Sequence, residues 1–130
     1  FDRLILDRRD SGRIVVGNPR DKYVININAA FSKFSTNIRL VRYGKVLGLN
    51  SASAAYDEVL NPKIVTDFTI SYSIIKELQL TLGANNIFDI YPDQVKYVQN
   101  NNDGRYVYPF IATQFSYFGR YIFASLNLKL

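Results

Sequence analysis

The sequence lacks four residue types completely, because histidine, cysteine, methionine and tryptophan are absent from its 130 residues. Without cysteine and histidine the chain has no thiolate nucleophile, no imidazole base and none of the usual zinc ligands. The absence of cysteine also fits a cell envelope, where unpaired thiols are a liability, although many cytosolic proteins lack it too. We therefore expect no enzyme, no cofactor and no metal site in this chain.

Long apolar runs are missing as well. No stretch of about 20 apolar residues exists, so we expect no transmembrane helix. The segment that opens on Phe1 has no hydrophobic region of the signal-peptide kind. This opening indicates that the chain begins in the middle of a longer protein, and we interpret it as a fragment.

Basic residues are in excess, but they are not concentrated. Lysine and arginine number 16 against 11 aspartates and glutamates, which gives a formal net charge of +5. In the N-terminal segment, arginines alternate with aspartates that largely cancel their field: Arg3, Arg8, Arg9, Arg13 and Arg20 with Asp2, Asp7, Asp10 and Asp21. A nucleic-acid site needs a basic patch, so this distribution argues against one.

What the sequence does have is alternation of apolar and polar residues. A period of two places successive side chains on opposite faces of a strand. The pattern occurs five times and predicts strands at about 22–32, 35–45, 63–74, 77–88 and 113–130. We therefore expect an all-β fold, an antiparallel meander of about five strands.

The two faces of these predicted strands differ in chemistry. In the fourth strand, Leu78, Leu80 and Leu82 oppose Gln79 and Thr81. Over all five strands the polar face holds mostly Asn, Ser, Thr, Gln and Gly rather than the Lys and Glu typical of a surface in bulk water. Such a face suits a confined, wet interior, and the opposite face suits lipid. An ordinary β-sandwich core remains the alternative.

The connections between predicted strands alternate in length. Short turns are expected around 32–34 and 75–76, whereas long polar loops are expected at 1–21, 46–62 and 89–112. Several loops of such length are unusual in a compact domain without a functional reason. Short turns at one end and long loops at the other are typical of bacterial outer-membrane barrels.

Tyrosine and phenylalanine gather near the predicted strand ends. Phe31 and Phe34 mark the short-turn end, and a second group marks the long-loop end: Tyr106, Tyr108, Phe110, Tyr117 and Phe118. These clusters resemble the two interfacial aromatic girdles of a membrane barrel.

One stretch is specific enough to indicate a family. Residues 83–89 read G-A-N-N-I-F-D and lead into Tyr91-Pro92-Asp93. This resembles the penultimate strand and last outer loop of TonB-dependent receptors. Further segments resemble the same region of that family, in the same order: 18–22, 42–44, 100–104, 106–109 and 118–120.

The resemblance implies a 22-stranded transmembrane β-barrel with a plug domain inside it, located in the outer membrane of a Gram-negative bacterium. Such receptors import scarce ligands such as ferric siderophores, cobalamin or glycans with energy from TonB. This chain is then the last five strands, and the full-length protein contacts TonB and plug through other segments. One departure concerns the last residue, because such barrels commonly end in an aromatic residue and this chain ends in Leu130.

Ligand capture by such a receptor is expected in the long loops, which hold five candidate contacts: Tyr91, Asp93, Tyr97, Tyr106 and Tyr108. The tyrosines can stack on a sugar or a catecholate, with membrane anchoring as the alternative. Residues 100–104 carry oxygen ligands but lack the order of a calcium loop, which favours a turn. Asp89 and Asp93 flank Tyr91 and resemble the carboxylate pair of a glycoside hydrolase, but their place at a strand-to-loop transition argues against catalysis.

Two other functions compete with the receptor. The main alternative is a soluble β-sandwich that binds carbohydrate with loop tyrosines. A hydrolase is a more remote alternative. If the chain is excised from a barrel, its two outer strands have open edges. We expect the isolated segment to pair edge to edge with another copy or to bury its apolar face against one.

Overall fold

The computed structural model describes residues 6–102, 104–110 and 114–129. Its described helices and strands are, in order, α1 (Arg8–Val15), β1 (Lys22–Phe31), β2 (Phe34–Tyr43), β3 (Val46–Gly48), η1 (Ala54–Tyr56), β4 (Glu58–Leu60), β5 (Lys63–Ile75), β6 (Leu78–Asn85), η2 (Val98–Asn100) and β7 (Tyr121–Leu128). No helix in the described ranges is long and apolar enough to cross a membrane.

The described residues fall into two compact units. The sheet unit comes from Tyr23–Arg42, Ile64–Ile90 and Phe118–Leu130, and the loop unit comes from the segments between these, with the N-terminal segment.

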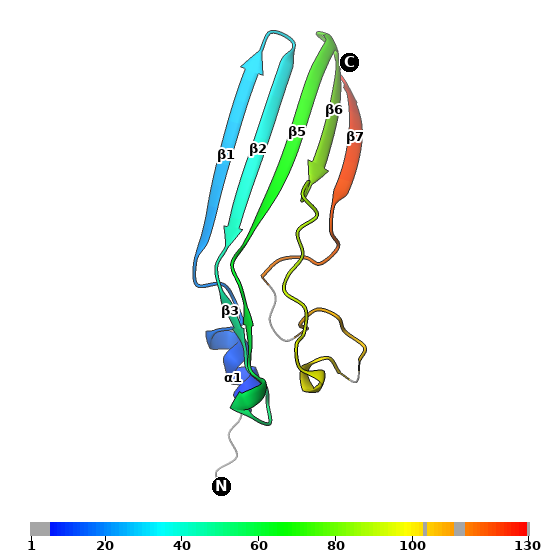
Figure 1. Ribbon diagram of the computed structural model, residues 1–130. Coiled ribbons are helices and arrows are strands. Elements are labelled where there is room, and N and C mark those ends of the chain that lie inside the picture. Colours follow the sequence, from blue (N-terminus) through cyan, green and yellow to red (C-terminus); the bar gives the residue numbers. More distant parts are fainter. Residues whose placement is uncertain (1–5, 103, 111–113, 130) are drawn as a thin grey trace. The chain divides into compact units, whose positions relative to one another are not determined.

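The sheet unit is a single five-stranded sheet in the order β1-β2-β5-β6-β7 (Figure 1). Its neighbours follow one another along the chain, with only the short β3-β4 ribbon inserted between β2 and β5. The β5-β6 and β6-β7 pairs are antiparallel. The predicted all-β meander of five strands is therefore confirmed at this level.

The register of the last three strands sorts their side chains into two faces. Leu80 of β6 pairs with Tyr72 of β5 and Leu126 of β7, whereas its neighbour Thr81 pairs with Ser71 and Ser125. Because partners in register point to the same side, these pairs define an apolar face and a polar face. The apolar face holds Phe68, Ile70, Tyr72, Leu78, Leu80, Leu82, Ala84, Ile122, Ala124, Leu126 and Leu128. The polar face holds Thr69, Ser71, Ser73, Gln79, Thr81, Gly83, Asn85, Tyr121, Phe123, Ser125 and Asn127.

Side-chain contacts extend the two faces across β1 and β2. The Phe34 ring lies 4.6 Å from the Tyr72 ring, which places it on the apolar face. On the polar face, Asn37 Nδ2 donates to Asn28 Oδ1 over 2.6 Å. Phe34 and Asn37 lie an odd number of residues apart, so their side chains point to opposite sides of β2, in agreement with these contacts.

The sheet has one layer in the described residues, and its apolar face is largely uncovered. Leu82 is 49% exposed and Leu126 is 63% exposed. Burying one such side chain fully stabilises a fold by about 1.5–3 kcal/mol, so a face of this kind in water normally has a second layer. The apolar face therefore needs an apolar environment that the described residues do not supply.

Tyr121 and Phe123 are aromatic exceptions on the polar face, and Gly83 explains the position of Phe123. A Cβ atom on Gly83 would lie 2.2 Å from the ring tip of Phe123, its cross-strand partner. The ring therefore lies over the glycine, and any larger residue at position 83 would displace it.

Several element boundaries differ from the prediction. β6 ends at Asn85 instead of 88, because Asn86 and Asp89 adopt positive φ values of 51° and 58° that a strand cannot contain. β7 begins at Tyr121, and residues 114–120 form no strand, while the predicted start at 113 and Leu130 lie outside the described residues.

The long loops also contain elements that the sequence did not predict. Residues 8–15 form α1, whose N-terminus is capped by the Asp7 carboxylate accepting from Asp10 N over 2.7 Å. The segment predicted as loop 46–62 contains the antiparallel β3-β4 ribbon. Tyr106, Tyr108 and Phe110 belong to the long β6-β7 connection, within the segment predicted as loop 89–112.

Candidate functional site

The loop unit has a small apolar centre in the β3-β4 ribbon. Val46 pairs with Leu60, and each is 1% exposed. Glu58 lies two residues before Leu60, so its side chain points to the same side of the ribbon and is 5% exposed. A carboxylate is therefore buried beside the apolar centre.

Glu58 connects the ribbon with the β6-β7 connection. Its Oε1 atom accepts from the backbone N–H groups of Lys96 and Tyr97, both over 3.1 Å, and from Asn100 Nδ2 over 3.0 Å. A buried carboxylate is costly unless donors surround it, and these three supply that stabilisation. Glu58 thus fixes the course of residues 96–100.

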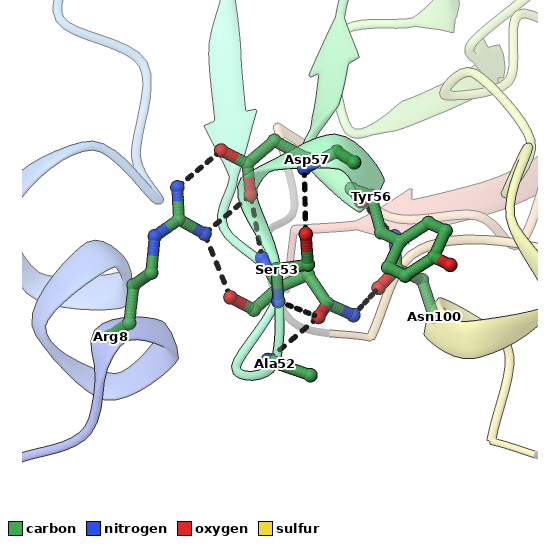
Figure 2. Close-up of polar contacts among 8 residues, drawn as sticks. Arg8, Ala52, Ser53, Tyr56, Asp57 and Asn100 are labelled. Carbon is green, nitrogen blue, oxygen red and sulfur yellow. Dashed lines mark hydrogen bonds and ion pairs between the residues drawn. The ribbon is translucent and has the colours of Figure 1, made fainter.

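Two asparagines continue this network (Figure 2). Asn50 Nδ2 donates to Asn100 Oδ1 over 2.6 Å, and Asn100 Nδ2 also donates to the carbonyl of Tyr56 over 2.6 Å. The Asn50 Oδ1 atom accepts from the backbone of Ala52 and Ser53. Both amides are almost fully buried, so each donor and acceptor named here stabilises the loop unit.

An arginine–aspartate pair attaches α1 to the same loop. Arg8 donates through both terminal nitrogens to the Asp57 carboxylate over 2.6 and 2.5 Å, and Arg8 Nη1 also donates to Asn50 O (Figure 2). The hydrogen bonds from Arg8 hold the pKa of Asp57 below its ordinary value, and those same bonds raise the pKa of Arg8. The pair is bidentate, which fixes the orientation of α1 on the loop.

The carboxylate of Asp93, one of the predicted ligand contacts, is bound by other residues of the loop unit. Lys63 Nζ lies 2.7 Å from Asp93 Oδ1, and Asn61 donates to Oδ2 through its backbone and its side chain over 2.7 and 2.8 Å. Burial acts to raise the pKa of Asp93, but the Lys63 and Asn61 hydrogen bonds outweigh it and the pKa is lowered. Asp89 belongs to the other unit, where its carboxylate accepts from the backbone of Arg120.

The predicted tyrosine contacts all lie in aromatic groups within the loop unit. Tyr108 stacks on Tyr91 at 5.7 Å with an interplanar angle of 8°, and on Tyr117 at 6.0 Å and 13°. Tyr97 meets Tyr56 edge to face, and Tyr106 stacks on Phe110. Tyr97 and Tyr106 are exposed, so part of each ring remains open to a ligand.

Residues 101, 102 and 104 lie in turns, as the sequence favours for this segment. Asn101 Oδ1 accepts from Gly104 N over 2.8 Å, and Asn100 points into the network around Glu58. Asp103 lies outside the described residues. Within the described ranges, no three carboxylates come close enough to hold a metal ion.

The polar face of the sheet unit offers a second polar surface. An open hollow of about 270 Å³ lies there, and its lining includes residues with side-chain amides and hydroxyls: Asn28, Ser35, Asn37, Thr69 and Ser71. Further along this face, Arg39 Nη1 lies 3.9 Å from Asp67 Oδ2. These groups can hydrogen-bond water or a polar ligand, but none is arranged as a nucleophile with a base.

No family model, curated protein or solved structure matches this chain. The site therefore has to be interpreted from its own chemistry. In the described residues that chemistry consists of a hydrogen-bonded loop unit with open tyrosine rings and a sheet with one apolar and one polar face.

Sequence reasoning missed the residues that hold the loop unit together. Gln114 is one of them, because its buried Nε2 donates to the carbonyls of Gly44 over 2.6 Å and Asn61 over 2.9 Å. Glu58 had a usable signal, since alternation from Leu60 places it on the inner side of a short strand. The Arg8–Asn50 and Asn50–Asn100 contacts had none, because the residues that each contact joins lie more than 40 residues apart in the sequence.

Proposed function

We propose that this chain is part of the wall of an outer-membrane β-barrel, in a TonB-dependent receptor that imports a scarce ligand such as a ferric siderophore, cobalamin or a glycan. The apolar face of the sheet would contact lipid, and the polar face would line a watery interior. The loop unit would belong to the ligand-capturing side. TonB and the plug would be contacted by other segments of the full-length protein.

One observation carries the membrane part of this proposal: the register puts every leucine of β6 on one side and its glutamine and threonine on the other. In lipid, every backbone polar group must be paired internally, and a sheet with side chains that alternate between lipid and interior meets that demand when its edges are closed. An apolar face with exposed leucines is stable in that setting and unstable in water.

The receptor part rests on the G-A-N-N-I-F-D segment and on the long connections. The structured loop unit supports it, because a pre-ordered loop loses less conformational entropy when it binds a ligand. The open faces of Tyr97 and Tyr106 suit sugars and aromatic chelators alike, so they are compatible with more than one ligand class.

Spin labels on the two faces test the membrane assignment. The chain has no cysteine, so Leu82→Cys and Ser125→Cys give single labelling sites on the apolar and polar faces. In the full-length protein in lipid vesicles, we expect the label at 82 to collide often with oxygen, which dissolves in lipid, and rarely with a water-soluble nickel chelate. The label at 125 should collide more with the chelate than the label at 82.

The soluble carbohydrate-binding module gives a different result in the same experiment. There the apolar face is packed against a second protein layer, so a label at 82 collides rarely with both reagents. That outcome overturns the membrane proposal. The coding sequence upstream of Phe1 separates the two functions independently, because the receptor requires further alternating strands and a plug domain there. Binding of ferric siderophores, corrinoids and oligosaccharides to the intact protein identifies the ligand.

A further inference from the structure

The loop unit contains an open hollow beside the start of β3. Its volume is about 330 Å³, and its lining comes from the end of α1, the segment that leads into β1, and β3 with the residue before it: Val16, Arg20, Asp21, Lys45 and Leu47. All five residues belong to the loop unit. A hollow of this size accommodates a small organic molecule.

The β3-β4 ribbon directs two of the lining side chains into the hollow. Val46 belongs to the buried centre of the loop unit and is 1% exposed, so its neighbours Lys45 and Leu47 point to the other side of the ribbon. Leu47 N donates to Val16 O over 3.2 Å, which holds the two apolar lining residues beside each other. A ligand in the hollow therefore meets hydrocarbon together with a cation.

Hydrogen bonds through Gly44 fix the two charged segments to each other. Gly44 N donates to Asp21 O over 2.9 Å, and Gly44 O accepts from the buried side-chain amide of Gln114 over 2.6 Å. A Cβ atom at position 44 would clash with Asp21 Oδ1, so this close approach requires glycine. The segments that carry Arg20 and Lys45 are thus ordered before a ligand arrives, which lowers the entropic cost of binding.

Positive charge is in excess in the hollow. Its two cations, Arg20 and Lys45, are exposed at its edge, and one carboxylate, Asp21, lines it with them. Among the residues that the structure describes, neither cation forms an ion pair, whereas Asp21 has further interactions. Two cations against one carboxylate leave an excess of one positive charge.

A guanidinium and an ammonium beside an apolar surface are complementary to an organic anion. The planar guanidinium donates to two oxygens of a phosphate or carboxylate group at once, and the ammonium adds a point charge. A neutral ligand of the same size would contact the apolar lining but would gain no ion pair.

We propose that this hollow binds a small organic anion through its phosphate or carboxylate group. Arg20 and Lys45 bind the anionic oxygens, and the hydrocarbon part of the ligand packs on Val16 and Leu47. The inference goes beyond the proposed function and does not depend on it, because every lining residue belongs to the loop unit and none to the sheet.

Fluorine NMR of para-fluorophenyl phosphate measures this binding, because the protein itself gives no fluorine signal. The full-length protein in micelles of a non-ionic detergent is titrated with the probe, and the same micelles without protein give the background. The probe para-fluorobenzoate replaces the phosphate by a carboxylate, and para-fluorobenzyl alcohol is the neutral probe. We expect the two anionic probes to bind at least fivefold more tightly than the neutral one.

Substitutions of the two cations locate the binding site. Arg20→Gln and Lys45→Gln should each weaken the binding of both anionic probes about fivefold, as expected for ion pairs at exposed positions. Lys45→Arg keeps the charge and should bind as the wild type does, which separates loss of charge from loss of folding. Arg105→Gln and Lys96→Gln are the matched controls, because they remove exposed charges of the same unit that do not line the hollow. Both should leave the affinity unchanged.

Three outcomes refute the site. Equal affinity in the wild type, Arg20→Gln and Lys45→Gln would place the probe elsewhere in the protein. Equal weakening in the control variants would show that the probe responds to total charge rather than to these two side chains. Binding of the neutral probe as tight as that of the anionic probes would remove the role of charge. None of these outcomes affects the membrane assignment, which the spin labels test separately.

Discussion

Glu58 is the residue on which the order of the β6-β7 connection depends most directly. Replacing it in Glu58→Ala leaves the N–H groups of Lys96 and Tyr97 and the amide of Asn100 without their acceptor. We expect the loop unit to lose about 2–3 kcal/mol, because unsatisfied buried donors are costly. Native-state hydrogen exchange at Lys96 and Tyr97 should report that loss as faster exchange.

A matched pair of variants distinguishes charge from hydrogen bonding at this site. Glu58→Gln keeps an oxygen acceptor but removes the charge, so its effect should be about half that of alanine. Glu77→Gln changes an exposed carboxylate in the β5-β6 turn and should leave exchange at 96 and 97 unchanged. Equal protection in wild type and Glu58→Ala contradicts the assigned role.

Gly83 and Phe123 should behave as one coupled pair. In Gly83→Ala the new methyl group would meet the Phe123 ring at 2.2 Å, so the ring must leave the polar face. We expect a loss of about 1–3 kcal/mol, the usual cost of overpacking. In a Phe123→Ala background the same glycine change should cost almost nothing, because the obstacle is gone. Urea unfolding of the four proteins in a double-mutant cycle measures the coupling. Additive effects would show that the two positions do not interact.

At the scale of single residues, the sequence predicted the face to which a side chain points better than the residue that it contacts. Alternation correctly placed Leu80 and Thr81 on opposite faces, because side-chain direction in a strand follows from position alone. It could not find the Asn50–Asn100 pair, since nothing local relates two amides that the fold brings together. Asp93 was predicted as a ligand contact. Its bonds to Lys63 and Asn61 could not be predicted, because no local pattern relates residues that lie far apart in the sequence.

Helix α1 is the element whose presence depends most on a single ion pair. A helix of eight residues is too short to be stable alone, so α1 relies on its contacts with the loop, among them the Arg8–Asp57 pair. The pKa of Asp57 is lowered by the fold, so its stabilisation is complete above the ordinary value of 3.8 and is lost as the pH falls through the lower, folded value. The pKa of Arg8 is raised by the fold, so the stabilisation that Arg8 contributes is complete at acidic and neutral pH and is lost only at strongly alkaline pH.

We therefore predict that acidification below about pH 4 releases α1. Amide exchange in residues 11–15, corrected for its intrinsic pH dependence, should accelerate at low pH in the wild type. Asp57→Asn should show fast exchange at all pH values, and its pH dependence should be flat. Asp93→Asn serves as the control because it removes a carboxylate of lowered pKa that contacts a different segment. Protection of α1 that is identical at pH 3 and pH 7 contradicts this account.

The elements differ in how much of them the sequence could predict. The cores of the five long strands followed from a period of two, while their ends depended on single backbone conformations such as that of Asn86. The sequence did not predict helix α1, because the helix contains a glycine and lacks an extended apolar stripe. Its residues read R-R-D-S-G-R-I-V. The glycine has a packing reason, since Leu49 lies where a Cβ atom of Gly12 would be.

For the whole molecule, the question is what covers the apolar face of the sheet. Few described hydrophobic residues are buried, namely Val41, Val46, Leu60 and Ala84. A sheet with so little core cannot offset the conformational entropy of its own strands in water. Either lipid or a protein surface must supply the missing burial, and we propose lipid.

Lysine substitutions on the two faces test that proposal through the free energy of folding. Leu82 pairs with Ile70 and Ala124 near the middle of the sheet, so Leu82→Lys would place a charge in the centre of the bilayer. The expected cost is about 2–4 kcal/mol in the folding of the full-length protein into lipid vesicles. Ser125→Lys is the matched control, since it adds the same charge on the polar face next to Ala124 and should cost less than about 1 kcal/mol. Urea titrations of vesicle-inserted protein, with equal slopes for all variants, give both values. The order of the two variants is decisive, because a sheet whose polar face lay in lipid would tolerate a lysine at 82 and reject one at 125.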